Sequence, residues 1–587
     1  MKKFILTFFA ALLAVMVGSV LSMFVFFGAI GAMLSFTNQS ETVAVSSNTV
    51  LRIMLDRPVQ ERGGDMQLNM GLNSLSIGSN IGLNDLLKGV KQAAVDPKIQ
   101  LIYMNLSDLY IGIGHAEELR NALLQFKESG KPIIAYADNF SQKAYYLASV
   151  ADKIYLNPYG SLNLKGLGAE LTFYKKLLEK LDVNMQIFRH GKYKSAIEPY
   201  TAEEMSSENR EQILSFTGSI WQHWLNGIAA ARQIDAAQIQ QLADNYDLSL
   251  AASPTVALSH NLIDGLLYKD QLLQELVKLT GAEDEQSLTM VEVDKYAKTV
   301  SPKSIAKERV AVVYADGAIG AGKYESNITD WHFANVLRKL RYDEQVKAVV
   351  FRVNSPGGQV QASEIIAREL TLLNDVKPVV VSMSNYAASG GYWISAPART
   401  IVANPTTLTG SIGVFGVVPD YSKGMRNYLG LTHDVAKTAQ AADFPTANRP
   451  MTTLESKKFQ SMIDTIYTQF VTKVAHSRNM GVQAVDDIAQ GRVWTGLQAV
   501  QNGLVDELGG LDRAIEIAAE YAELTDYRIT ELPEQKDPMT QLMSLIKGSG
   551  VQANNKLMQT YKQLEKQTEQ WLHTQVLARM PYEVDFE

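Results

Sequence analysis

One long segment of this chain occurs twice, and no other feature constrains the fold as strongly. Lys131–Asn139 (KPIIAYADN) recurs 246 residues later as Lys377–Asn385 (KPVVVSMSN). Further on, Ala257–Asp270 and Ala499–Asp512 share alanine, leucine and aspartate at matching positions. The period is far longer than the roughly 20–50 residues of solenoid repeats, and 587 residues are too many for one core. We therefore expect a duplicated domain.

Each copy alternates strand and helix patterns, as an α/β domain does. Short apolar runs predict strands buried on both faces, and the stretches between them have helical periodicity. The predicted order is strand, helix, strand at Gln100–Leu106, His115–Phe126 and Ile133–Tyr136, and again at Ala348–Val353, Ala362–Leu373 and Val379–Met383. Long amphipathic helices are predicted at Ser207–Arg232 and Leu454–Ser477. This order implies right-handed crossovers and a largely parallel sheet in each copy.

The N-terminus predicts a membrane anchor. Lys2 and Lys3 precede an almost wholly apolar stretch from Phe4 to Phe36, and the next charge is Glu41. A helix needs about 20 apolar residues to cross the hydrocarbon core. The alternative is a cleavable signal peptide cut near Ala29–Ala32, but the apolar run is about twice the usual length. The paired lysines would stay cytoplasmic, which leaves everything after about residue 40 outside the cytoplasmic membrane.

These patterns divide the chain into six parts. We expect a cytoplasmic start and transmembrane anchor at 1–36, a tether at 37–48, an N-terminal repeat domain at 49–280, a linker at 281–308, a C-terminal repeat domain at 309–525, and a helical tail at 526–587. The tail has helical, amphipathic stretches within Met539–Ala578, and its role is open.

Composition excludes several classes of function. The chain has no cysteine, which rules out thiolate catalysis, Cys-ligated zinc and disulfides. Its 62 acidic residues outnumber 55 basic ones, so there is no electrostatic footprint for nucleic acid. We expect no metal and no cofactor.

The two copies differ where chemistry is expected. The second copy has Pro356-Gly357-Gly358 after its first strand and Ser389-Gly390-Gly391 after its next. The first copy lacks both and has Lys143 opposite Ser389, but it contains Lys194, which the second copy lacks. Each half therefore carries groups that the other does not.

Ser389 is the candidate nucleophile. It lies between small residues, directly after a predicted strand and at the start of a predicted helix (Gly390–Ala396). Glycines let a substrate approach the backbone closely, so the N–H groups of Gly357, Gly358 and Gly390 are candidates for an oxyanion hole. Ligand sites of open α/β sheets lie at this carboxyl edge of the strands.

A serine nucleophile needs a base, and two candidates remain open. None of the 8 histidines lies among small residues, and His190 is the one nearest to Lys194 in sequence. An ordinary lysine is neutral only about once in 2,500 at pH 7, so Lys194 would have to be buried to act as a base. Its glycine, alanine, tyrosine and isoleucine neighbours permit burial.

Together these motifs resemble the S49 serine peptidase family in its long, tandem-repeat form. The matching stretches are Gly191–Pro199, Val353–Gly358, Ala387–Trp393, Thr409–Gly416, Gly491–Gly496 and Gly503–Gly510. The resemblance implies two tandem domains with a fold related to the ClpP/crotonase superfamily. It also implies a Ser/Lys dyad in which Ser389 is the nucleophile, Lys194 is the general base and acid, and Ser411 orients the lysine. An endopeptidase that digests cleaved signal peptides and other apolar peptides is expected, as a homotetramer at the inner membrane.

Two other functions share this fold class. A crotonase-like acyl-CoA enzyme also uses backbone oxyanion holes, but a domain outside the cytoplasm has no supply of coenzyme A. A non-catalytic assembly protein is the second alternative, and the presence of both Ser389 and Lys194 argues against it.

Overall fold

The structure is a computed structural model that describes residues 45–64, 67–70, 73–76, 80–300, 304–322, 327–534 and 575–580, with Gly18, Leu21 and Ser22. Apart from those three residues, the predicted anchor at 1–36 lies outside the described part. No helix within the described residues combines the length and apolar character needed to cross a membrane.

The first repeat is built on a six-stranded parallel sheet, ordered β10-β8-β7-β6-β1-β11. Its strands are β1 (Thr49–Leu55), β6 (Ile99–Leu109), β7 (Ile133–Ala137), β8 (Lys153–Leu156), β10 (Gly265–Leu266) and β11 (Met290–Glu292). Its main helices are α2 (Leu83–Val95), α3 (Ile113–Lys127), α4 (Gln142–Ala148), α7 (Ser207–Arg232) and α10 (Lys269–Thr280). All five residues of β7 are buried, which explains its continuous apolar run.

The second repeat repeats this plan. Its main strand path is β21-β19-β17-β15-β12-β23, parallel except where β21 pairs with β19. The strands are β12 (Arg309–Asp316), β15 (Val346–Ser355), β17 (Val379–Ala388), β19 (Leu408–Gly410), β21 (Val493–Thr495) and β23 (Arg528–Leu532), and β18 (Thr400–Ala403) and β22 (Glu507–Leu508) branch from it. Its main helices are α12 (Asp330–Tyr342), α13 (Val360–Asn374), α14 (Gly390–Ser395), α16 (Thr453–Ser477) and α19 (Leu511–Tyr521). The predicted α/β class and largely parallel sheets are confirmed.

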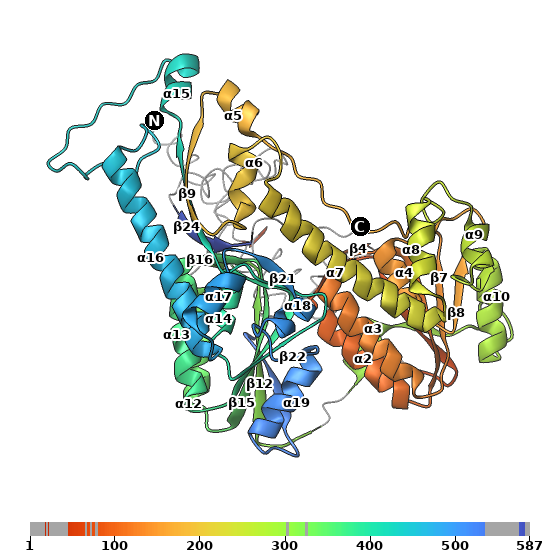
Figure 1. Cartoon of the computed structure of the whole chain (residues 1–587). Helices are drawn as coiled ribbons and strands as arrows, with labels where there is room; N and C mark the ends of the chain where they lie inside the picture. The colour runs from red at the N-terminus through yellow and green to blue at the C-terminus, as the bar shows by residue number, and fades with distance from the viewer. Residues whose placement is uncertain are drawn as a thin grey trace, which may run out of the picture.

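A third sheet joins the two repeats. It is ordered β14-β13-β16-β24-β20-β9 and combines β9 (Asn184–His190) of the first repeat with β16 (Gly357–Gln359) and β20 (Val414–Asp420) of the second. The remaining strands are β13 (Ile319–Gly320), β14 (Ile328–Thr329) and β24 (Gln575–Arg579). In Figure 1 this sheet lies beside the long helix α16. Segments from three distant parts of the chain therefore meet here.

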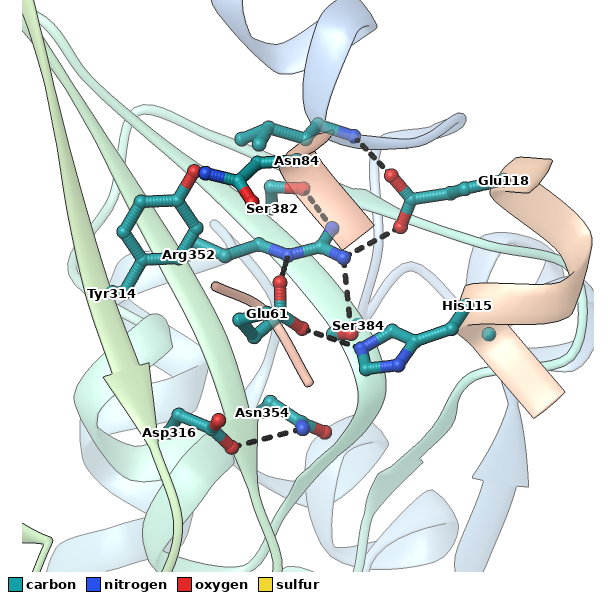
Figure 2. Close-up of polar contacts among 12 residues, drawn as sticks. Glu61, Asn84, His115, Glu118, Tyr314, Asp316, Arg352, Asn354, Ser382 and Ser384 are labelled. Atoms are coloured by element: carbon teal, nitrogen blue, oxygen red, sulfur yellow. Dashed lines mark hydrogen bonds and ion pairs between the residues drawn. The ribbon is translucent and has the colours of Figure 1, made fainter. Parts of the chain in front are cut away.

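A buried ion network also holds the repeats together (Figure 2). The guanidinium of Arg352 on β15 is fully buried and donates to Glu61 (2.8 Å) and Glu118 (2.6 Å), which belong to the first repeat. It also donates to Ser382 and Ser384 on β17. Burial raises the pKa of Glu61, but the charges and hydrogen bonds of Arg352 and His115 together outweigh burial and hold that pKa below its ordinary value. The network therefore links the two repeats through buried ion pairs.

Two of the expected segments contain secondary structure that the sequence did not predict. The segment 281–308, expected as a linker, contains β11 and α11 (Val293–Thr299), and β11 extends the first sheet beside β1. In the same way β23 extends the second sheet beside β12, although it lies in the tail expected to be helical. β24, in the same tail, is a strand as well. β11 and β23 lie at the edges of their sheets, and none of these three short strands has the continuous apolar run that marks a buried strand.

Candidate active site

Ser389 lies at a sharp turn between β17 and α14. Its backbone has φ 56° and ψ −113°, which is unusual for a residue with a side chain. Two hydrogen bonds hold the turn, from Ser389 N–H to the Gly410 carbonyl (2.8 Å) and from Trp393 N–H to the Ser389 carbonyl (2.8 Å). A Cβ at Gly391 would lie 2.6 Å from the Ser355 carbonyl, so the helix can begin here only with glycine. Strain of this kind is common where a nucleophile is presented.

Lys194 reaches the same place from the first repeat. β9 pairs with β20 so that His190 opposes Val414, and Lys194 and Ser411 lie just beyond the ends of the two strands. Its side chain passes between glycines: a Cβ at Gly413 would lie 3.3 Å from Lys194 Cδ, and one at Gly491 would lie 2.8 Å from Lys194 Cβ. Neither glycine can therefore be replaced without moving the lysine.

Three predicted residues meet at the lysine amine. Lys194 Nζ lies 2.8 Å from Ser389 Oγ, 2.9 Å from Ser411 Oγ and 3.0 Å from the Ser411 carbonyl. All three side chains are completely buried. Ser411 is itself fixed by a hydrogen bond from its N–H to the Arg492 carbonyl (2.7 Å).

Burial lowers the pKa of Lys194 well below its ordinary value of 10.5. Desolvation favours the neutral amine, and the groups bonded to Nζ are a carbonyl and two hydroxyls rather than a carboxylate. The site therefore favours the neutral amine, which is the form of lysine that can accept a proton.

The glycines proposed for an oxyanion hole lie around this turn. Gly390 is the first residue of α14, and Gly357 and Gly358 are buried on β16, which contacts that helix. Gly357 has φ 101°, and its N–H donates to Ser355 Oγ (3.2 Å). A Cβ at Gly358 would lie 2.0 Å from the Ile319 carbonyl, so this position requires glycine for packing as well.

His190, the other candidate base, is engaged elsewhere. His190 Nδ1 lies 2.8 Å from Asp464 Oδ1, and its ring stacks on Tyr467 at 3.9 Å. Lys143 lies on α4 in the first repeat, where the N-cap is Ser141. Within the described residues, no cluster of acidic or histidine side chains is arranged to hold a metal ion.

Sequence reasoning missed the residues that support the lysine. Gln212 on α7 donates to the Tyr193 carbonyl (2.9 Å) and to Ser195 Oγ (2.9 Å), and so holds the loop on both sides of Lys194. Gly413 and Gly491 fall within the stretches that carried the resemblance, but nothing local linked them to Lys194. Gly413 and Gly491 follow Lys194 in the sequence by about 220 and 300 positions. Residue spacing alone does not reveal contacts between positions so far apart.

Known proteins resemble this chain in both repeats. The family described as Peptidase family S49 matches residues 125–283 and 371–525. Protease 4 of Salmonella typhi is 37% identical over 80% of this chain and 76% of that protein. The chloroplastic serine protease SPPA of Arabidopsis thaliana is 32% identical over 80% of this chain and 70% of that protein. The putative signal peptide peptidase SppA of Enterococcus faecium is 36% identical over 39% of this chain and 67% of that protein.

Proposed function

The chain belongs to peptidase family S49 and is a serine peptidase, and we propose that Ser389 and Lys194 form its catalytic dyad. The contact of 2.8 Å between a buried, uncompensated amine and Ser389 Oγ carries this proposal. Desolvation lowers the pKa of a lysine, and the neutral amine that results can act as a general base. The pairing of His190 with Asp464 makes that histidine the weaker candidate.

The geometry supports a two-step hydrolysis. In its neutral form the lysine amine donates two N–H groups to Ser411 and keeps a lone pair for the proton of the Ser389 hydroxyl. Ser389 Oγ attacks the scissile carbonyl, and Lys194 then passes the proton to the leaving amine. Water, activated by the same lysine, releases the acyl group from Ser389.

Backbone N–H groups would stabilise the oxyanion. Gly390 directly follows the nucleophile, and Gly357 and Gly358 lie on the neighbouring strand. Donors fixed by the fold stabilise the negative charge without reorganising in the transition state.

The substrate and location are part of the same proposal. We assign the protein to the periplasmic side of the inner membrane, held by a single-pass anchor at 1–36 and assembled as a homotetramer. Its substrates are cleaved signal peptides and other apolar peptides, and the name of the Enterococcus faecium relative favours this class. An anchored enzyme shares the membrane with such segments. The relation of each repeat to the ClpP/crotonase fold belongs to this proposal as well.

Digestion of a synthetic signal peptide and of casein tests the assignment. Ser389→Ala and Lys194→Ala should each abolish hydrolysis while the circular dichroism spectrum stays that of the wild type. Hydrolysis by Ser389→Ala at the wild-type rate would refute the nucleophile, and activity in Lys194→Ala would direct attention to His190.

A further inference from the structure

One glutamine side chain is bonded to both repeats beside the candidate active site. Gln212 lies on α7 of the first repeat and is completely buried, and α7 passes beside β21 of the second repeat (Figure 1). Its Nε2 donates to the Tyr193 carbonyl (2.9 Å) and to Ser195 Oγ (2.9 Å). Its Oε1 accepts a hydrogen bond from Val493 N–H (3.3 Å), at the start of β21. The amide therefore connects the residues on both sides of Lys194 to a strand of the other repeat.

The strand that Gln212 holds leads to the nucleophile. Val493 lies opposite Gly410 in the pairing of β21 with β19. The Gly410 carbonyl accepts the hydrogen bond from Ser389 N–H (2.8 Å) that holds the turn at the nucleophile. The carbonyl of the residue before Val493 accepts a hydrogen bond from Ser411 N–H (2.7 Å). Both serines that contact the lysine amine are therefore held by β19, by β21 or by the residue next to β21.

Neighbouring polar groups fix which way the Gln212 amide points. Glu198 is buried and accepts a hydrogen bond from Asn209 Nδ2 (2.9 Å), so the side-chain oxygen of Asn209 faces Gln212 and lies 3.2 Å from its Nε2. A reversed amide would set its oxygen against the oxygens of Tyr193 and Asn209, and its N–H groups against Val493 N–H. The position therefore requires an amide of this length in one orientation.

The need to satisfy buried polar groups does not by itself explain this glutamine. The Tyr193 carbonyl already accepts a hydrogen bond from Ser195 N–H (2.8 Å), so it would keep a donor without Gln212. The second hydrogen bond adds a restraint on the loop that carries Lys194. A displacement of about 1 Å at a reacting group can cost a factor of about 100 in rate. Such a restraint therefore matters for the contact of 2.8 Å between Lys194 Nζ and Ser389 Oγ.

We propose that Gln212 is a positioning residue of the peptidase reaction, which sets the distance between Lys194 and Ser389 by bonding the lysine loop to β21. This inference rests on the proposed Ser389–Lys194 dyad. Gln212 acts through the backbone of residues 193 and 493 and through Ser195 Oγ. Its loss lets the base and the nucleophile move apart, which slows the chemical step and leaves substrate binding nearly unchanged.

Gln212→Met in the full-length protein tests the proposal, because methionine keeps the length of the side chain and removes its hydrogen bonds. We expect kcat for a quenched fluorescent signal peptide to fall about 10- to 100-fold, with KM within about threefold. Gln222→Met is the matched control: Gln222 lies exposed on the same helix and donates to Asn226 (3.1 Å), so kcat should stay within about twofold. An unchanged kcat in Gln212→Met, or a rise in KM alone, would overturn the inference.

Ser195→Ala covers the case in which the glutamine variant does not fold. Alanine removes one acceptor of the Gln212 amide and keeps the backbone, so kcat should fall about two- to tenfold. In the Gln212→Met protein the same change should lower kcat by less than about a further twofold, because the contact is already lost. Wild-type kcat in Ser195→Ala, or effects that multiply in the double variant, would also contradict the proposed role.

Fluorophosphonate labelling of Ser389 separates this inference from the dyad on which it rests. If Gln212 acts through Lys194, Gln212→Met should slow labelling about 10- to 100-fold when Lys194 is present and less than about twofold in Lys194→Ala. Labelling of Lys194→Ala at the wild-type rate would refute the dyad. Slow labelling of Lys194→Ala together with wild-type labelling of Gln212→Met would refute the role of Gln212 and leave the dyad standing.

Discussion

Replacing Ser411 with alanine should slow catalysis while leaving substrate binding nearly intact. Lys194 Nζ has two partners in Ser411, the hydroxyl at 2.9 Å and the carbonyl at 3.0 Å, and the variant removes only the first. Alanine keeps the Cβ at the unusual φ of 49°, so the backbone strain is unchanged. The side chain is completely buried, and no bulk water replaces the lost oxygen.

The size of the effect follows from that lost contact. A hydrogen bond to a charged or reacting amine contributes about 1.5–3 kcal/mol, which corresponds to a fall in kcat of about 10- to 150-fold. KM should stay within about threefold, because a positioning residue acts on the chemical step. A quenched fluorescent peptide assayed across a pH series gives both parameters.

The same series distinguishes positioning from a general structural effect. Ser411 Oγ accepts a hydrogen bond from the amine and so favours its charged form, and its removal should lower the pKa of Lys194 further. The acid limb of the kcat profile should therefore move to lower pH. An unchanged kcat, or a loss seen in KM alone with the limb unmoved, would refute the proposed role of Ser411.

Three further predictions concern Lys194, the first-copy residue Lys143 that lies opposite Ser389 in the repeat, and the joint between the repeats. Because burial lowers the pKa of Lys194 below 10.5, activity should rise with pH as the amine loses its proton and level off well below that value; activity that falls over this range would contradict a neutral lysine base. Lys143→Ala should keep kcat/KM within about twofold, and a larger loss with the fold intact would mean that the first copy contributes to the site. Arg352→Met leaves two buried carboxylates without their cation and should lower the free energy of unfolding by about 3–5 kcal/mol in urea titrations. The control Arg309→Met, whose pairing with Asp343 is more exposed, should cost at most about 1 kcal/mol.

The secondary structure could be predicted well where strands are buried and helices are amphipathic. Ser207–Arg232 is a helix with the predicted bounds, and Leu454–Ser477 differs from α16 by one residue. Such segments bury one whole face, so their periodicity is strong. β11, β23 and β24 were missed because they gain their order from a neighbouring strand instead of from an apolar pattern of their own.

The site could be predicted in its parts but not in its assembly. Ser389 was recognisable from the small residues around it, and the comparison of the two copies singled out Lys194. The contact between Ser389 and Lys194 depends on two strand registers. One is the register of β9 against β20. The other is the register of β17 against β19, in which Ala388 lies opposite Gly410. β9 and β20 belong to different repeats, so their register depends on how the repeats pack and is not encoded by a local pattern.

The most direct test of the dyad is covalent labelling of the full-length protein with a fluorophosphonate probe, followed by peptide mapping with mass spectrometry. The adduct should lie on Ser389, and its rate of formation should fall at least about 100-fold in Lys194→Ala, since the hydroxyl then lacks its base. An adduct on another residue, or labelling of Ser389 at the same rate without Lys194, would contradict the account.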